Sequence, residues 1–211
     1  MKTAVIIVPM MPPRAVEPIN YPVDGSKAIE YGKPVRCPAN GVLAKTMKKG
    51  EEVRVIYIIA AGPNSYCDEM RDIFWAELKD INKEIQADLK EPIIVEMEFQ
   101  ATRHVNYKLI LDLANAIPES AEIIADITYG FKTETLASIC ALRFAEDFRS
   151  ATVQHLIYAK LETNQKTRKK ENPMLYDVTS LYYLFKLMGT IGEGGADAET
   201  AMKILKDFFA I

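Results

Sequence analysis

Residues 126–132 read Asp-Ile-Thr-Tyr-Gly-Phe-Lys, and the interpretation of the whole chain starts from them. They follow an apolar run at 121–125, which predicts a buried strand, and they precede residues 133–148, whose apolar spacing predicts a helix. A strand that turns into a helix at Thr-Tyr-Gly brings backbone N–H groups, a hydroxyl and a lysine together, which is typical of phosphate-binding sites. An ordinary strand-to-helix turn, with glycine for the bend and a solvated lysine, explains the same local pattern.

Apolar strands alternate with helical patterns on both sides of this stretch. Strands that are apolar throughout, rather than alternating, indicate a sheet that is buried on both faces. Strand-helix-strand repetition predicts an α/β, Rossmann-like fold, in which a mostly parallel, doubly wound sheet carries helices on both faces. A closing β-hairpin with a polar, lysine-rich tip at 166–170 and a C-terminal helix at 197–209 complete the prediction. The strands are expected at 3–8, 53–60, 93–100, 122–128 and 153–161, and the other helices at 68–89, 106–117 and 133–148.

The composition restricts the class of protein. The 211 residues are 49% hydrophobic and 26% charged, enough to build one full domain with a sizeable core. A net charge of −3 argues against a surface that grips duplex DNA. No apolar run approaches the roughly 18 residues of a membrane span, and the N-terminus leads directly into a strand without a signal-peptide pattern. We therefore expect a cytoplasmic protein that contacts no membrane.

The cysteines and histidines give no indication of a metal or a disulfide. Cys37, Cys67 and Cys140 are far apart and odd in number, so they form neither a disulfide framework nor a CxxC site. The two histidines lack metal-binding spacing. We therefore expect no metal and no cofactor.

Loops at the carboxyl ends of the predicted strands provide the candidate site. In a doubly wound sheet, ligands bind beyond these ends. The four loops after the first four strands contain hydroxyls, amides, two arginines and a lysine but no acidic side chain, which favours an anionic ligand. The candidate ligand-binding residues from these loops are Pro9, Met10, Met11, Gly62, Asn64, Ser65, Thr102, Arg103, Asn106, Thr128, Tyr129, Gly130, Phe131, Lys132 and Thr133.

Residues 126–132 resemble the Asp-Ile-Thr-His-Gly-Phe-Arg signature of CARF domains, the CRISPR-associated Rossmann fold. Two other segments support the resemblance: Ala-Ile-Pro-Glu at 116–119, before the strand that leads to the signature, and Met-Leu-Tyr-Asp-Val-Thr at 174–179, which is similar to the family's closing strand and turn. The resemblance covers about residues 3–190. It therefore divides the chain into a CARF domain at 1–190 and a linker with a C-terminal helix at 191–211.

The resemblance implies a receptor for cyclic oligoadenylate, the second messenger that type III CRISPR complexes make in antiviral defence. CARF domains pair as two-fold homodimers and hold the ring in a cleft across the axis. A ring of four or six adenylates can have two-fold symmetry itself, so a symmetric dimer presents each loop to it twice. Lys132 and the backbone around Gly130 would then contact phosphates. Ribose or adenine edges would face Asn64, Ser65, Thr102, Arg103 and Asn106.

Two positions depart from the family pattern. Tyr129 stands where the family usually has His, which removes a group that titrates near neutral pH and adds a phenol able to donate a hydrogen bond or stack on a base. Lys132 stands where Arg is usual, so the charge is kept while the planar, two-pronged contact with phosphate is lost.

Three functions remain open at this stage. The first is a sensor that passes ligand binding on to an effector. About twenty residues follow the family-like region, too few for an effector domain, so we expect either an excised sensor domain or a protein that acts on a separate partner. The second is a metal-independent ring nuclease, in which a ribose 2′-OH attacks the neighbouring phosphorus and Lys132, Thr128 or Tyr129 is catalytic. The third is a CARF-type transcription regulator, which the acidic net charge and the lack of a visible helix-turn-helix disfavour.

Overall fold

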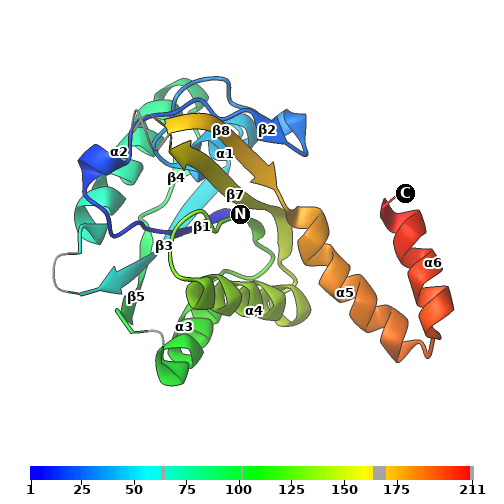
Figure 1. The fold of residues 1–211 in the computed structure, drawn as a ribbon. Helices are drawn as coiled ribbons and strands as arrows, with labels where there is room; N and C mark the ends of the chain where they lie inside the picture. The colour runs from blue at the N-terminus through cyan, green and yellow to red at the C-terminus, as the bar shows by residue number, and fades with distance from the viewer. Residues whose placement is uncertain (63–64, 101, 164–169, 210–211) are drawn as a thin grey trace. The chain divides into compact units, whose positions relative to one another are not determined.

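The computed structural model describes residues 1–62, 65–100, 102–163 and 170–209 (Figure 1). The chain divides into two compact units, Met1–Asp177 and Val178–Ile211. The boundary expected at 190/191 stays a prediction. A single helix, α5 (Thr179–Glu193), runs across it without a break.

The first unit is built on an eight-stranded sheet. Its strand order is β2-β8-β7-β6-β1-β3-β4, and β5 pairs with the remaining length of β3 next to β4. Every pairing is parallel except the antiparallel hairpin of β7 and β8. The predicted mostly parallel sheet with a closing hairpin is thereby confirmed. The strands are β1 (Lys2–Ile7), β2 (Val23–Asp24), β3 (Glu52–Ala61), β4 (Asp88–Leu89), β5 (Ile93–Glu98), β6 (Glu122–Asp126), β7 (Thr152–Thr163) and β8 (Lys170–Asp177).

Helices cover both faces of this sheet. In Figure 1, α1 (Pro38–Thr46) and α2 (Cys67–Ile85) lie above the sheet, whereas α3 (Arg103–Ala116) and α4 (Lys132–Arg149) lie below it and pack against each other. Two short 3-10 helices, Pro13–Ala15 and Lys27–Ile29, occur in the connection between β1 and α1. The doubly wound arrangement matches the prediction. The hairpin tip predicted at 166–170 falls largely on residues 164–169, outside the described part of the chain.

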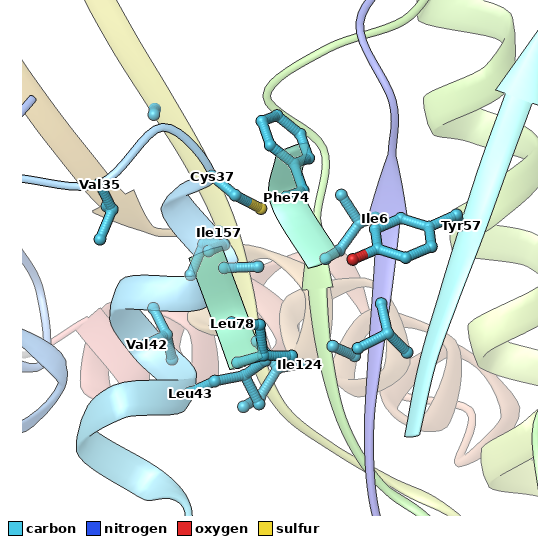
Figure 2. Packing of buried hydrophobic residues seen from close by; sticks show 14 of the residues in the cluster. Ile6, Val35, Cys37, Val42, Leu43, Tyr57, Phe74, Leu78, Ile124 and Ile157 are labelled. Atoms are coloured by element: carbon cyan, nitrogen blue, oxygen red, sulfur yellow. The ribbon is translucent and has the colours of Figure 1, made fainter. Parts of the chain in front are cut away.

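The main core lies between the sheet and the upper helices. Alternate residues of each strand point to the same face, so Ile6, Tyr57 and Ile124 from three neighbouring strands pack with Leu43 of α1 and Phe74 of α2 (Figure 2). All five side chains are almost completely buried. This packing fixes the positions of β1, β3 and β6, the three strands that lead to the candidate site.

The strand order reverses between β1 and β6. The chain leaves β1 through α1 to reach β3 on one side, and it returns through α3 to β6 on the other side. Ile6 of β1 therefore pairs with Tyr57 of β3 and with Asp126 of β6. In open α/β sheets a crevice forms at such a reversal, outside the carboxyl ends of the strands. Residues 126–132 begin at this point.

The second unit consists of α5 and α6 (Ala198–Phe209). Gly194 follows α5 directly, and Gly195 has a φ of 71°, which glycine adopts at little cost. The C-terminal helix expected at 197–209 is confirmed as α6, which begins one residue later. Among the described helices, none combines the length and the apolar character needed to span a membrane.

Candidate functional site

A cavity of about 430 Å³ opens at the reversal of the strand order. It lies at the carboxyl ends of β1, β3, β5 and β6, where the fold predicts a ligand site. Its walls are mostly apolar, and its volume falls within the roughly 300–1,000 Å³ of small-molecule sites. The lining residues are Ile7, Val8, Pro9, Met10, Met11, Ile58, Ala60, Phe99, Tyr129, Gly130, Phe131 and Glu134.

The turn after β6 reaches this cavity because residue 130 is glycine. Gly130 has a φ of 90°, a conformation that L side chains rarely adopt. A Cβ atom at this position would lie 2.6 Å from Cγ2 of Ile7 and would also collide with the carboxylate of Glu134. The turn therefore packs against β1 at a distance that excludes any side chain.

Asp126, the first residue of the signature, has a structural role. Its carboxylate is buried, with 2% of the residue exposed, and it accepts the N–H of Thr128 at 2.9 Å and the N–H of Ala39, near the start of α1, at 3.0 Å. Burial raises the pKa of this carboxyl, and the hydrogen bonds oppose that rise. Asp126 thus links the end of β6 to its own turn and to α1.

A second carboxylate occupies the same end of α1. Glu77 of α2 accepts the N–H of Arg36 at 2.7 Å and the N–H of Cys37 at 3.1 Å, and it also accepts the side-chain amide of Asn40 at 2.9 Å. Negative charge at a helix N-terminus is favourable because it complements the helix dipole. The protein's own carboxylates therefore occupy the position that an anionic ligand would take at α1.

Glu134 plays the corresponding part at α4. It is the third residue of the helix, 2% exposed, and its Oε2 atom accepts the N–H of Phe131 at 2.9 Å. Its Oε1 atom is buried and has no hydrogen-bond partner among the described residues. Burial raises the pKa of this carboxyl. The four loops contain no carboxylate, but Glu134 brings one to the cavity from the first helical turn, and this weakens the argument for an anionic ligand.

Aromatic side chains form much of the remaining wall. Phe99 and Phe131 are in contact, with ring centroids 5.2 Å apart and planes tilted by 43°. Tyr129 is half-buried against the core, and burial, together with nearby Tyr21 and Asp126, raises the pKa of its phenol. The phenol therefore stays neutral near pH 7 and is poorly suited to act as a general base. Sequence reasoning placed Phe99 inside a strand at 93–100, but β5 ends at Glu98.

Several predicted loop residues hold the local structure instead of lining the cavity. The hydroxyl of Ser65 accepts the N–H of Cys67 at 3.2 Å at the start of α2, and that of Thr102 accepts the N–H of Val105 at 3.3 Å at the start of α3. The hydroxyl of Thr128 accepts the N–H of Ala159 in β7 at 2.9 Å. Gly62 packs against Phe99, where an added Cβ would lie 3.0 Å from the Phe99 Cβ.

Most of the other predicted residues lie in the first turns of α3 and α4, outside the cavity. Lys132 and Arg103 are exposed at the first positions of α4 and α3, and no ion pair joins either of them to a described residue. Thr133 and Asn106 are half-buried in the first turns of the same helices, and neither lines the cavity. Asn64 lies outside the described residues. The cavity thus gathers six of the predicted residues: Pro9, Met10, Met11, Tyr129, Gly130 and Phe131.

The chain was compared with protein-family models and with curated proteins. Neither comparison finds a match. The resemblance to CARF domains therefore rests on residues 126–132 and the two supporting segments, and it stays a hypothesis.

Sequence reasoning missed Glu134 because it lies in the first turn of a helix, and it missed Phe99 because the strand was expected to continue to residue 100. A signal for Glu134 was present, since glutamate at the third position of a helix commonly accepts the N–H of the residue before the helix. Phe99 carried no comparable signal. Its position depends on where β5 ends, and sequence patterns locate strand ends least reliably.

Proposed function

We propose that this chain binds cyclic oligoadenylate as a homodimer and relays the signal of type III CRISPR defence. One observation carries the proposal: the CARF-like signature forms a wall of an apolar cavity where the strand order reverses, through Tyr129, Gly130 and Phe131. A turn that merely connected β6 to α4 would not need to border a cavity of this size.

The size of the cavity favours a shared ligand. A volume of about 430 Å³ accommodates one nucleoside but not a ring of four or six nucleotides. The rest of the ring would extend beyond the carboxyl edge of the sheet. A second copy related by a two-fold axis would receive another nucleoside of the same ring, because a symmetric dimer presents the same surface twice.

The charges near the cavity support a phosphate contact by Lys132. Carboxylates already occupy the N-termini of α1 and α4, so these helix ends offer little to an anion. The side chain of Lys132 is exposed and has no carboxylate partner among the described residues. Lys132 directly follows Phe131, which lines the cavity. Lysine binds phosphate as a point charge, so it tolerates variation in the position of the ring.

The exposed face of α4 supports the homodimer. Leu136, Phe144 and Phe148 are 62%, 41% and 74% exposed, and with exposed Cys140 they recur every four residues along the helix. This α4 stripe therefore forms one continuous apolar surface. Because Lys132 begins the same helix, a two-fold axis that runs parallel to α4 would bring two signature turns to one side of the dimer.

Binding and cleavage assays with labelled cyclic tetra-adenylate and cyclic hexa-adenylate test the proposal. We expect the wild-type protein to retain one of the rings and Lys132→Ala to lose retention by tenfold or more while its melting temperature is unchanged. The matched control is Lys49→Ala, which removes an exposed lysine just before β3, at the opposite edge of the sheet. Failure of the wild type to retain either ring would contradict the proposal.

Ring cleavage is the second candidate, and it is favoured by the ammonium of Lys132, which forms no ion pair with a described residue. Negative charge grows on the phosphate oxygens as a 2′-OH attacks, and a fixed cation beside them lowers that barrier. Thr128 and Tyr129 are less suited to catalysis, since the Thr128 hydroxyl accepts a β7 amide and the Tyr129 pKa is raised. Linear products ending in a cyclic phosphate, lost in Lys132→Ala, would assign cleavage; retention without products would assign sensing alone.

A further inference from the structure

One residue that lines the cavity, Glu134, has a polar atom without a partner. Oε1 of Glu134 is buried, and none of the described residues donates a hydrogen bond to it. A buried acceptor without a donor costs free energy, and the cost is larger for a carboxylate than for a neutral group. Oε2 accepts the N–H of Phe131, so the hydrogen-bonding capacity of Oε1 is unused within the described residues. Because Glu134 lines the cavity, a ligand bound there is the nearest source of a donor.

The surrounding walls indicate the shape of such a ligand. Phe99, Phe131 and Tyr129 provide aromatic surfaces, and Met10 and Met11 add flexible apolar contacts on the β1 side. Aromatic walls stack on planar rings, and thioethers adapt to their edges. No cationic side chain lines the cavity within the described residues. A phosphate in the cavity would therefore face the Glu134 carboxylate and apolar side chains, with no cation beside it. A neutral planar ring can stack on the aromatic walls and donate a hydrogen bond to the carboxylate.

We propose that this cavity holds a planar heteroaromatic base whose exocyclic amino group donates a hydrogen bond to Oε1 of Glu134. The inference rests on the proposed function, under which the base is an adenine of the ring and the donor is its N6 amino group. It goes beyond that function by assigning base selection to Glu134, a residue outside the CARF-like signature.

Selection would follow from the direction of the hydrogen bond. Adenine presents an N–H₂ donor at position 6, whereas hypoxanthine presents a carbonyl oxygen at the same place. That oxygen would face the Glu134 carboxylate, so the hydrogen bond would be lost and two acceptors would lie side by side. One hydrogen bond to a charged group corresponds to a discrimination of about tenfold or more.

The test compares cyclic tetra- and hexa-adenylate with the same rings carrying hypoxanthine in place of adenine. We expect wild type to bind the adenine ring at least tenfold more tightly. Glu134→Gln should remove or invert this preference, because its amide can turn an N–H₂ donor toward the hypoxanthine carbonyl while its oxygen still accepts the N–H of Phe131. The matched control is Glu69→Gln, an exposed glutamate at the third position of α2. It should leave the preference unchanged.

The outcomes separate this inference from the proposed function. Equal binding of the two rings by wild type, or a full adenine preference in Glu134→Gln, would overturn the role of Glu134 and leave the receptor function intact. If no ring binds, the proposed function fails, and saturation-transfer NMR with adenosine and inosine then tests the cavity directly. A signal from adenosine that exceeds that from inosine, and that Glu134→Gln equalises, would support the cavity assignment. Absence of this difference would overturn it.

Discussion

Gly130 is the residue on which the geometry of the cavity depends most directly. Gly130→Ala would place a side chain at a φ of 90° and bring its Cβ within 2.6 Å of Ile7 Cγ2. Backbone strain at positive φ costs about 1–2 kcal/mol, and forced overpacking adds about 1–3 kcal/mol. We expect the free energy of unfolding to fall by about 2–5 kcal/mol, measured by urea denaturation.

Gly32→Ala is the matched control for this substitution. Gly32 has a φ of 74°, and an added Cβ would meet nothing within 4 Å. Only the backbone strain should destabilise this variant, so its free energy of unfolding should fall by about 1–2 kcal/mol. Equal losses in the two variants would contradict the close approach of the turn to β1.

Glu134 should make the stability of the protein depend on pH in a defined direction. Burial raises its folded-state pKa above the ordinary value of 4.5, so above pH 4.5 the folded state binds more protons than the unfolded state. The wild type therefore loses stability as the pH rises through the folded-state pKa. Gln at this position does not titrate.

The free energy of unfolding of Glu134→Gln, minus that of wild type, should therefore increase between pH 4 and pH 8. Chemical denaturation at several pH values measures this difference, in which the contributions of Asp126 and other shared groups cancel. A difference that stays constant or decreases would mean that the Glu134 carboxylate is not destabilised by burial in the folded protein.

At the residue scale, the sequence predicted the turn but not the chemistry around it. The glycine and the strand-to-helix change were visible in residues 126–132, and Gly130 has the expected conformation. The partners of Asp126 were not visible, because Ala39 is 87 residues away in sequence and joins it only after α1 packs on the sheet. Likewise, Glu134 lines the cavity only because its turn packs against Ile7 of β1, a contact that local patterns do not encode.

At the scale of elements, α4 connects the candidate site to a surface. Its buried side packs beneath the sheet, and its outer side presents the α4 stripe of Leu136, Cys140, Phe144 and Phe148. Phe148→Glu should convert the dimer to a monomer at micromolar concentration, because a buried, unpaired charge at an apolar interface is strongly unfavourable. Light scattering measures the change in mass.

Ala76→Glu provides the control for charge. Ala76 is exposed on α2, which covers the opposite face of the sheet, and the substitution adds the same negative charge to a helix. It should leave the mass at that of a dimer. A wild-type protein that is monomeric, or a Phe148→Glu variant that remains dimeric, would place the interface elsewhere or remove it.

Elements with a strong apolar pattern were predicted, and elements without one were missed. The stripe of α2 was visible, although the helix ends at Ile85 because Gln86 adopts a left-handed φ of 63°. Helix α3 begins at Arg103, earlier than expected, because Thr102 caps it. Helix α1 was missed since it begins with Pro38 and contains Gly41. The two-residue strands β2 and β4 depend on pairing alone, so no local signal marks them.

At the scale of the whole molecule, the sheet topology creates the site. Residues 126–132 lie near Pro9, Met10 and Phe99 only because β1 stands between β6 and β3, with β5 beyond. The sequence supported this arrangement through apolar strands and alternating helices, which allow few other topologies. It could not reveal that both neighbouring helix ends carry carboxylates, since those contacts exist only in the assembled fold.

The shared-site hypothesis makes a prediction about stoichiometry. If each copy holds one base and the ring spans the two-fold axis, isothermal titration should give one ring per two chains, and the complex should retain the mass of a dimer. Binding only to the folded dimer should also stabilise it by about 2.7 kcal/mol when free ligand is a hundredfold above its dissociation constant. Phe148→Glu should lose this affinity together with dimerisation, although its own cavity is unchanged. Tight binding of one ring per chain by that monomeric variant would mean that a single cavity and a single Lys132 suffice, and the two-fold arrangement would have to be abandoned.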